Sequence, residues 1–192
     1  MSKTKIIFPK AEWSLLYRSL QSACPEAFNE SGDILNLVEG KWQNEGNLKP
    51  FNSCIDGTLL GYYPMLRAAD GQKAVEHTAT EFQAWKFVPL DARKQKVTAA
   101  LDQMDEHKEL LSYLLMWEIG KPYLQALDDV ERCINGVRWY ISQIDTMLTD
   151  RTPLGVVSNI ASWNYPLSVL VHACLVQVLS GNAVIAKTPT DG

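Results

Sequence analysis

Two polar side chains follow short apolar segments late in the sequence, in positions where a side chain can contact a ligand. Asn164 lies shortly after the apolar run at residues 155–161, and Lys187 directly follows the apolar run at residues 183–186. An asparagine amide can donate a hydrogen bond to an oxygen that becomes negatively charged during a reaction. Asn164 could instead cap the helix expected after it, and Lys187 could be an ordinary solvated lysine. The spacing of the residues alone does not decide between a functional and a structural role for either residue.

The cysteines and histidines form no recognisable catalytic or metal-binding arrangement. The four cysteines are widely separated without a Cys-x-x-Cys pair, so they indicate neither a zinc site nor a disulfide scaffold. The three histidines are isolated from one another, which disfavours a metal site or a general base. We expect no metal, and we expect Cys174 to be a small core residue. The residues concerned are Cys24, Cys54, Cys133, Cys174, His77, His107 and His172.

The composition is that of a globular protein without a nucleic-acid footprint. Of 192 residues, 46% are hydrophobic, and 18 basic and 22 acidic residues give a net charge of -4 without long blocks of one sign. The first residues are too weakly apolar for a signal peptide, and the apolar stretch at residues 167–179 is too short for a membrane span. We therefore expect a cytoplasmic protein with a small-molecule or protein partner.

The segments around Asn164 and Lys187 predict a βαβ unit. Residues 155–161 are β-branched and mostly apolar, and they are followed by a turn and an apolar helix at residues 167–179. After a Ser-Gly-Asn stop, residues 183–186 form a second short strand. The two strands are expected to be parallel, with a right-handed crossover. Ligands bind beyond the carboxyl ends of such strands, although no Gly-x-Gly-x-x-Gly fingerprint is present.

The first third of the sequence has a weaker pattern. Apolar spacing predicts a helix at residues 10–23, and a short strand is expected at residues 34–38. That strand turns back through residues 39–42 into a loop rich in Asn, Gly and Pro. A turn and a second strand at residues 58–63 follow this loop.

Three consecutive helices are predicted in the middle of the chain. Asp70 is placed to cap the first, which ends near Trp85, and Pro89 marks the first turn of the second, which continues to about Ile119. Gly-Lys-Pro at residues 120–122 is interpreted as a helix break, and a third helix follows. The predicted fold class is α/β, with N-terminal helices leading into the first βαβ unit of a Rossmann-like parallel sheet.

Three blocks of sequence stand in succession in the C-terminal part. They are Pro-Leu-Gly-Val-Val at residues 153–157, Ser-Trp-Asn-Tyr-Pro-Leu at residues 162–167 and Gly-Asn-Ala-Val-Ile-Ala-Lys at residues 181–187. In order and spacing they resemble the aldehyde dehydrogenase superfamily. Weaker similarities precede them at residues 39–42, at residues 52–57, at Trp85 with Pro89 and Arg93, and in Glu-Ile-Gly-Lys-Pro at residues 118–122. The resemblance covers roughly residues 38–192 and leaves residues 1–37 as an N-terminal extension with one helix.

The resemblance implies an incomplete cofactor-binding domain and roles for individual residues. The family oxidises an aldehyde to an acid through a thiohemiacetal and a thioester, and a hydride passes to the nicotinamide of NAD or NADP. By resemblance, Asn164 donates to the oxyanion that forms when a thiolate attacks the aldehyde. Ala161, Ser162 and Trp163 line the cofactor cleft, and Lys187 hydrogen-bonds the adenosine ribose. Trp163 could instead be a core aromatic beside a turn.

Thr190 marks a departure from the family that bears on the choice of cofactor. In NAD-preferring members the corresponding segment reads Lys-x-x-Glu, and the glutamate binds a ribose hydroxyl while repelling the 2′-phosphate of NADP. Here the segment reads Lys187-Thr188-Pro189-Thr190, so its fourth residue is the neutral Thr190. The sequence therefore predicts that NADP is accepted.

The family's nucleophilic cysteine and its water-activating glutamate have no counterpart in this sequence. Both lie in segments beyond those matched here, so we interpret the chain as an N-terminal fragment that oxidises no aldehyde by itself. A non-catalytic nucleotide-binding or assembly module is the alternative, and a helical interaction protein would leave the strand blocks unexplained. Only residues 147–152 separate the last helix from Pro153. Since many members insert an oligomerising strand there, a reduced arm is expected, with a homodimer of the complete enzyme as a hypothesis.

Overall fold

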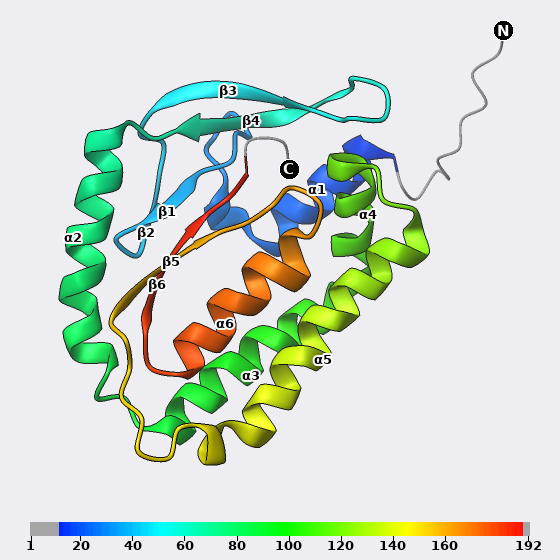
Figure 1. Cartoon of the computed structure of the whole chain (residues 1–192). Coiled ribbons are helices and arrows are strands. Elements are labelled where there is room, and N and C mark those ends of the chain that lie inside the picture. Colours follow the sequence, from blue (N-terminus) through cyan, green and yellow to red (C-terminus); the bar gives the residue numbers. More distant parts are fainter. Residues whose placement is uncertain (1–11, 190–192) are drawn as a thin grey trace, which may run out of the picture.

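The computed structural model describes residues 12–189, which form an α/β arrangement (Figure 1). The helices are α1 (Trp13–Ala23), α2 (Ala68–Trp85), α3 (Leu90–Glu106), α4 (Lys108–Ile119), α5 (Tyr123–Met147) and α6 (His172–Leu179), with a 3₁₀ turn η2 (Pro25–Ala27) and a π-helical turn η3 (Pro166–Val171). The strands are β1 (Asn36–Val38), β2 (Lys41–Gln43), β3 (Asn47–Asn52), β4 (Leu59–Met65), β5 (Val156–Ile160) and β6 (Ala183–Lys187).

The predicted βαβ unit is confirmed. Strands β5 and β6 are parallel, in a register that runs from Val156 opposite Ala183 to Ile160 opposite Lys187. Turn η3 and helix α6 connect them. Helix α2 packs against both strands from one side and α6 from the other, so this strand pair lies between helices (Figure 1).

Helices α3 and α5 form a further layer behind α6, and α4 packs on α5 (Figure 1). The core between these helices consists of apolar side chains that recur at helical spacing, which is why the periodicity of the sequence located the helices. Its fully buried members include Val97, Leu101, Val130, Val137 and Leu179. This core fixes the position of α6 and therefore of the loop that precedes it.

The N-terminal segment packs against α4 through a second, smaller cluster. Leu16 of α1 and Leu60 of β4 are buried against Trp117 of α4. Two hydrogen bonds support this packing: Trp13 Nε1 donates to the Leu60 carbonyl at 2.9 Å, and Ser53 Oγ, in the turn after β3, donates to the Trp117 carbonyl at 2.7 Å. The described part of the predicted helix at residues 10–23 is thus tied to the middle helices, while residues 10 and 11 lie outside the described range.

The loop predicted after residue 42 is partly wrong, because it contains strand β3. This strand pairs with β4 in antiparallel register, with Asn47 opposite Met65 and Lys49 opposite Tyr63. Its sequence lacks alternating apolar residues, so local pattern gave no signal. Pro50 is accommodated because each strand of a two-stranded sheet is an edge strand, where a missing N–H is tolerated.

Asp70 does not cap α2, contrary to the prediction. Arg67 occupies the N-cap position without a capping side-chain bond, and Asp70 lies in the first turn. The Asp70 carboxylate pairs there with Arg67 Nε at 2.8 Å. An acidic residue is favoured in a first turn by the helix dipole, and this effect can be mistaken for capping in a sequence.

The helix predicted from Pro89 to Ile119 is two helices, because His107 interrupts it. Both α3 and α4 place an apolar face on α5. The apolar period therefore continues through the interruption, and periodicity alone does not distinguish one helix from two. The chain has four consecutive helices, α2 to α5, where three were predicted.

Candidate functional site

The amino ends of β5 and β6 are held together by the side chain of Asn182. Its Oδ1 accepts hydrogen bonds from the backbone N–H groups of Leu154 at 2.6 Å and Gly155 at 3.1 Å, while its Nδ2 donates to Gln177 Oε1 at 2.8 Å. Asn182 is only 3% exposed. The Pro-x-Gly-Val and Gly-Asn blocks thus contact each other directly and fix the start of the strand pair.

Gly181 lies against Arg93 of α3 at the same end. A Cβ atom on Gly181 would come within 2.1 Å of Arg93 Nη1 and 2.9 Å of Pro153 Cγ, and the backbone of Gly181 has φ +90°, so glycine is required. Arg93 is buried, and its Nε and Nη1 have no hydrogen-bond partner among the described residues. Burial lowers the pKa of this guanidinium.

The carboxyl ends of the strands carry the residues that the sequence predicted for the site. The chain leaves β5 at Ala161, whose N–H lies 3.5 Å from the Lys187 carbonyl at the end of β6. Ala161 is buried, Ser162 is exposed and Trp163 is 52% exposed. The Lys187 ammonium is exposed and donates to the Thr188 carbonyl at 2.7 Å. The fold therefore brings the predicted loop and Lys187 to one edge.

Asn164 is not used as the cap of the following helix. Turn η3 begins at Pro166, its N-cap residue is Tyr165, and no side-chain hydrogen bond caps it. The capping interpretation of Asn164 is therefore wrong. Trp163 is too exposed to be a core aromatic, so that alternative is also wrong. Thr190 lies outside the described residues.

Lys121 is a residue that sequence reasoning missed at this edge. The Gly-Lys-Pro segment does break the helix, since Gly120 ends α4 in the left-handed conformation. The Lys121 ammonium, however, lies 2.9 Å from Asp129 Oδ2 and 4.0 Å from the centroid of the Tyr165 ring. The similarity to a family motif that contains a lysine was the available signal.

The environments of three cysteines disfavour a reactive thiolate. Burial, with the nearby charge of Asp129, raises the pKa of Cys133 to about 12. Burial also raises the pKa values of Cys174 and Cys24. Cys54 is exposed. Within residues 12–189, no group of three or more His, Cys, Asp or Glu side chains could hold a metal ion.

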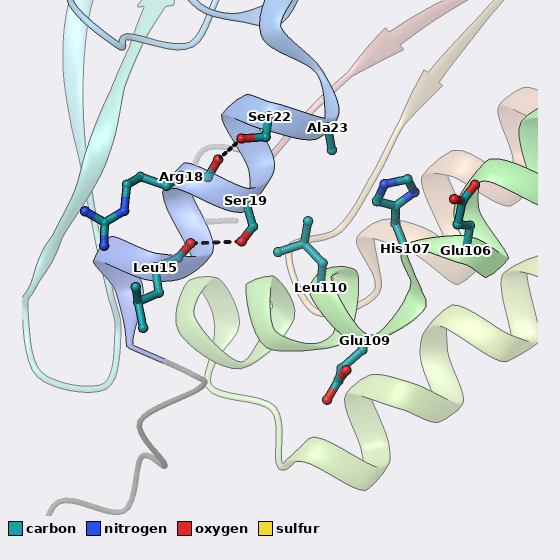
Figure 2. A pocket seen from close by; sticks show the side chains of 9 residues that line it. All are labelled: Leu15, Arg18, Ser19, Ser22, Ala23, Glu106, His107, Glu109 and Leu110. Atoms are coloured by element: carbon teal, nitrogen blue, oxygen red, sulfur yellow. Dashed lines mark hydrogen bonds between the residues drawn. The ribbon is translucent and has the colours of Figure 1, made fainter.

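A surface hollow between α1 and the α3–α4 junction lies apart from these residues (Figure 2). Ser19 and Ser22, which line it, donate their hydroxyls to carbonyls of their own helix at 3.0 and 2.9 Å. Figure 2 shows the Arg18 side chain pointing away from His107 and Leu110 on the opposite wall. The hollow contains none of the predicted site residues.

The chain belongs to the aldehyde dehydrogenase family, because residues 42–192 match the family model of that description. Malonate-semialdehyde dehydrogenase 2 of Shouchella clausii (strain KSM-K16) is 26% identical over 171 residues, a match that covers 81% of this chain and 35% of that protein. A malonate-semialdehyde dehydrogenase 1 of Bacillus anthracis is 25% identical with the same coverage. The chain thus spans about a third of the length of these relatives, 35%.

Solved structures support the fold. A 1-pyrroline-5-carboxylate dehydrogenase R100A mutant of Thermus thermophilus superposes with a TM-score of 0.80 at 22% identity, over 92% of this chain and 37% of that one. An NADP-dependent glyceraldehyde-3-phosphate dehydrogenase of Bacillus halodurans C-125, complexed with NADP, superposes with a TM-score of 0.75 at 24% identity, over 83% and 38%. The predicted α/β cofactor-domain architecture is therefore confirmed. Between residues 12 and 189 no helix has the length and apolar character needed to cross a membrane.

Proposed function

We propose that the complete protein is an NAD(P)-dependent aldehyde dehydrogenase, in which this chain supplies an oxyanion-binding amide and part of the dinucleotide cleft. The main support is the arrangement at one strand edge, where the loop with Asn164 lies beside the end of β6 with Lys187. Asn164 makes no hydrogen bond to another described residue, so its amide is available to an oxyanion. Loss of one such donor costs roughly 2.7–4 kcal/mol of transition-state stabilisation.

The same edge fits a nicotinamide dinucleotide. Ala161 and Ser162 offer backbone groups beyond the end of β5, Trp163 offers a half-exposed aromatic face, and Lys187 offers an exposed ammonium. A nicotinamide dinucleotide held at this edge would supply the hydride acceptor for oxidation of the aldehyde carbon. The Lys187 ammonium would bind the adenosine ribose, and Trp163 would line the cofactor cleft.

The experiment that tests this function replaces Asn164 by Ala in the complete enzyme. We expect kcat to fall by about 10²–10³ while the Kd for the cofactor stays within about twofold, because the hydrogen bond strengthens in the transition state. Asn44→Ala, at an exposed asparagine, is the control. Equal losses in kcat and cofactor affinity would contradict the proposed role.

Thr190 is proposed to permit the use of NADP, because a neutral residue there does not repel the 2′-phosphate. We expect measurable kcat/KM with NADP and a shift towards NAD in Thr190→Glu. A strong NAD preference that this substitution leaves unchanged would remove Thr190 from the discrimination.

A non-catalytic nucleotide-binding or assembly module is the second candidate, since three described cysteines have raised thiol pKa values. Sequencing the gene beyond the codon for residue 192 separates the two. A downstream Cys and Glu in family context supports the enzyme, and a stop codon supports the module.

Cytoplasmic location and a homodimer of the complete enzyme, with residues 1–37 as an extension of the family region, are further parts of the proposed function.

A further inference from the structure

The Lys121 ammonium is held in a largely buried position between a carboxylate and an aromatic ring. The Lys121 side chain is 11% exposed and Asp129 is 1% exposed, and the two are joined by an ion pair of 2.9 Å. On its other side the ammonium faces the ring of Tyr165 at 4.0 Å, well within the range of cation–π attraction. The ion pair thus directs a fixed positive charge onto the residue that follows Asn164.

Few other contacts fix this loop. The side chains of Ser162, Trp163 and Asn164 make no hydrogen bond to another described residue, and residues 163 and 164 form a turn. The loop is bonded at its two ends, where the Ala161 N–H faces the Lys187 carbonyl and the Tyr165 carbonyl accepts from the Val169 N–H at 3.2 Å. Because no side-chain hydrogen bond fixes residues 162–164, the side-chain contact at Tyr165 has a large influence on where Asn164 lies.

We propose that Lys121 is a positioning residue: anchored by Asp129, it holds the Tyr165 ring and so fixes the loop that presents the Asn164 amide. Its functional consequence rests on the proposed function, in which that amide binds the oxyanion. A fixed donor stabilises the transition state more than a mobile one, because an oxyanion hole is effective only when its donors are already in position.

The first test measures how firmly Tyr165 is held, by amide hydrogen exchange at Val169, whose N–H donates to the Tyr165 carbonyl at 3.2 Å and is the reporter of exchange in the loop. Replacing Lys121 alone would leave the Asp129 carboxylate buried without a partner, so the principal variant is Lys121→Met with Asp129→Asn. We expect exchange in the loop to rise about 5- to 30-fold, a cation–π contact being lost, while exchange in α3 stays unchanged. Lys121→Arg keeps a cation against the ring and is expected to restore slow exchange.

Lys94→Met is the matched control. Lys94 of α3 pairs with Asp145 of α5, so its removal also deletes a lysine–aspartate bridge to α5, here one with an exposed carboxylate, without touching Tyr165. We expect no change of exchange in the loop. Unchanged loop exchange in the principal variant, or an equal rise in the control, would overturn the proposal.

Kinetics of the complete enzyme distinguish this inference from the proposed function. The principal variant is expected to lower kcat about tenfold, less than Asn164→Ala, with KM for the cofactor nearly unchanged. If Asn164→Ala has no effect on kcat, the proposed function fails, whereas a loosened loop still supports the positioning role. If Asn164→Ala lowers kcat but the principal variant changes neither loop exchange nor kcat, the inference about Lys121 fails.

Discussion

The two ends of the β5–β6 strand pair differ in how their polar groups are used. At the amino end, Asn182 satisfies two backbone N–H groups, and Gly181 fits against Arg93 with no room for a side chain. At the carboxyl end, Asn164 is without a hydrogen-bond partner among the described residues, and Trp163 and Ile160 are 52% and 73% exposed. The amino end is therefore closed by the bonds of Asn182 and the packing of Gly181, although Arg93 Nε and Nη1 have no partner among the described residues, and the carboxyl end is open.

This difference separates residues that hold the fold from residues that are available to a ligand. A buried polar side chain with all its bonds made inside the protein stabilises one arrangement of the chain. An exposed polar or aromatic side chain without internal partners contributes little to the stability of the fold and is accessible to a ligand. Blocks that match the same family can therefore have different physical roles, one in stability and one in ligand binding. Substitutions at the two ends of the strand pair should separate these roles.

The largest loss of stability is expected for Gly181→Ala at the closed end. A Cβ there must displace Arg93 or Pro153, and the backbone has φ +90°, so the free energy of unfolding should fall by about 2–4 kcal/mol. Urea unfolding of the purified chain measures this. Gly71→Ala is the control, because Gly71 lies in α2 with open space around it, and we expect it to be neutral or slightly stabilising. Similar losses in both variants would refute the steric argument.

Asn182→Ala should come next, with a loss of about 2 kcal/mol, because two backbone N–H groups at the start of β5 lose their acceptor. Asn182→Asp keeps an acceptor oxygen and loses the bond to Gln177, so it should cost less. Thermal unfolding of the two variants side by side gives the comparison. An Asp variant that is less stable than the Ala variant would contradict this account.

A smaller effect is expected from Glu118, three residues before Lys121. Burial raises the pKa of Glu118 from 4.5 to about 7, so the folded state binds the proton more tightly than the unfolded state. Its contribution to stability is therefore present below pH ~4.5 and is lost as the pH rises through about 7. Because the side chain keeps some solvent exposure, we expect a change on the order of 1 kcal/mol.

The Glu118 effect is measured by chemical denaturation of the unmodified chain and of Glu118→Gln, which gives the free energy of unfolding of each between pH ~4.5 and about 7. Burial lowers the pKa of His172, which gives a dependence of opposite sign in the same range, so the difference between the two proteins is the relevant quantity. A difference that does not vary with pH would show that Glu118 titrates normally.

The smallest effect on stability is expected for Trp163→Ala at the open end, within about 0.5 kcal/mol, because the side chain is 52% exposed. In the complete enzyme the same substitution should weaken cofactor binding measurably. A large loss of stability without a change in cofactor affinity would show that Trp163 stabilises the fold, as residues at the amino end do. It would contradict the proposed difference between the two ends of the strand pair.

The sequence predicted those helices and strands whose buried side chains recur at regular spacing along the chain. The apolar periods of α2 to α5 and the β-branched run of β5 mark elements that bury one side or both, because local spacing determines which side chains share a face. The family blocks located the loop at residues 161–165 and Lys187. Strand β3 was missed because it is stabilised by pairing with β4 and not by an apolar pattern of its own. The break at His107 was missed because α3 and α4 both pack on α5, so the apolar period continues across it.

By itself, the sequence determined the βαβ unit, the family and the position of Asn164 between a strand and a helix. Only the tertiary structure decided that Tyr165 rather than Asn164 occupies the N-cap position, that Gly181 is required by Arg93, and that Lys121 reaches Tyr165. The reason is physical: periodicity reports on neighbours along one element, whereas these contacts join residues far apart in the chain, and their distances depend on how the helices pack around the strand pair.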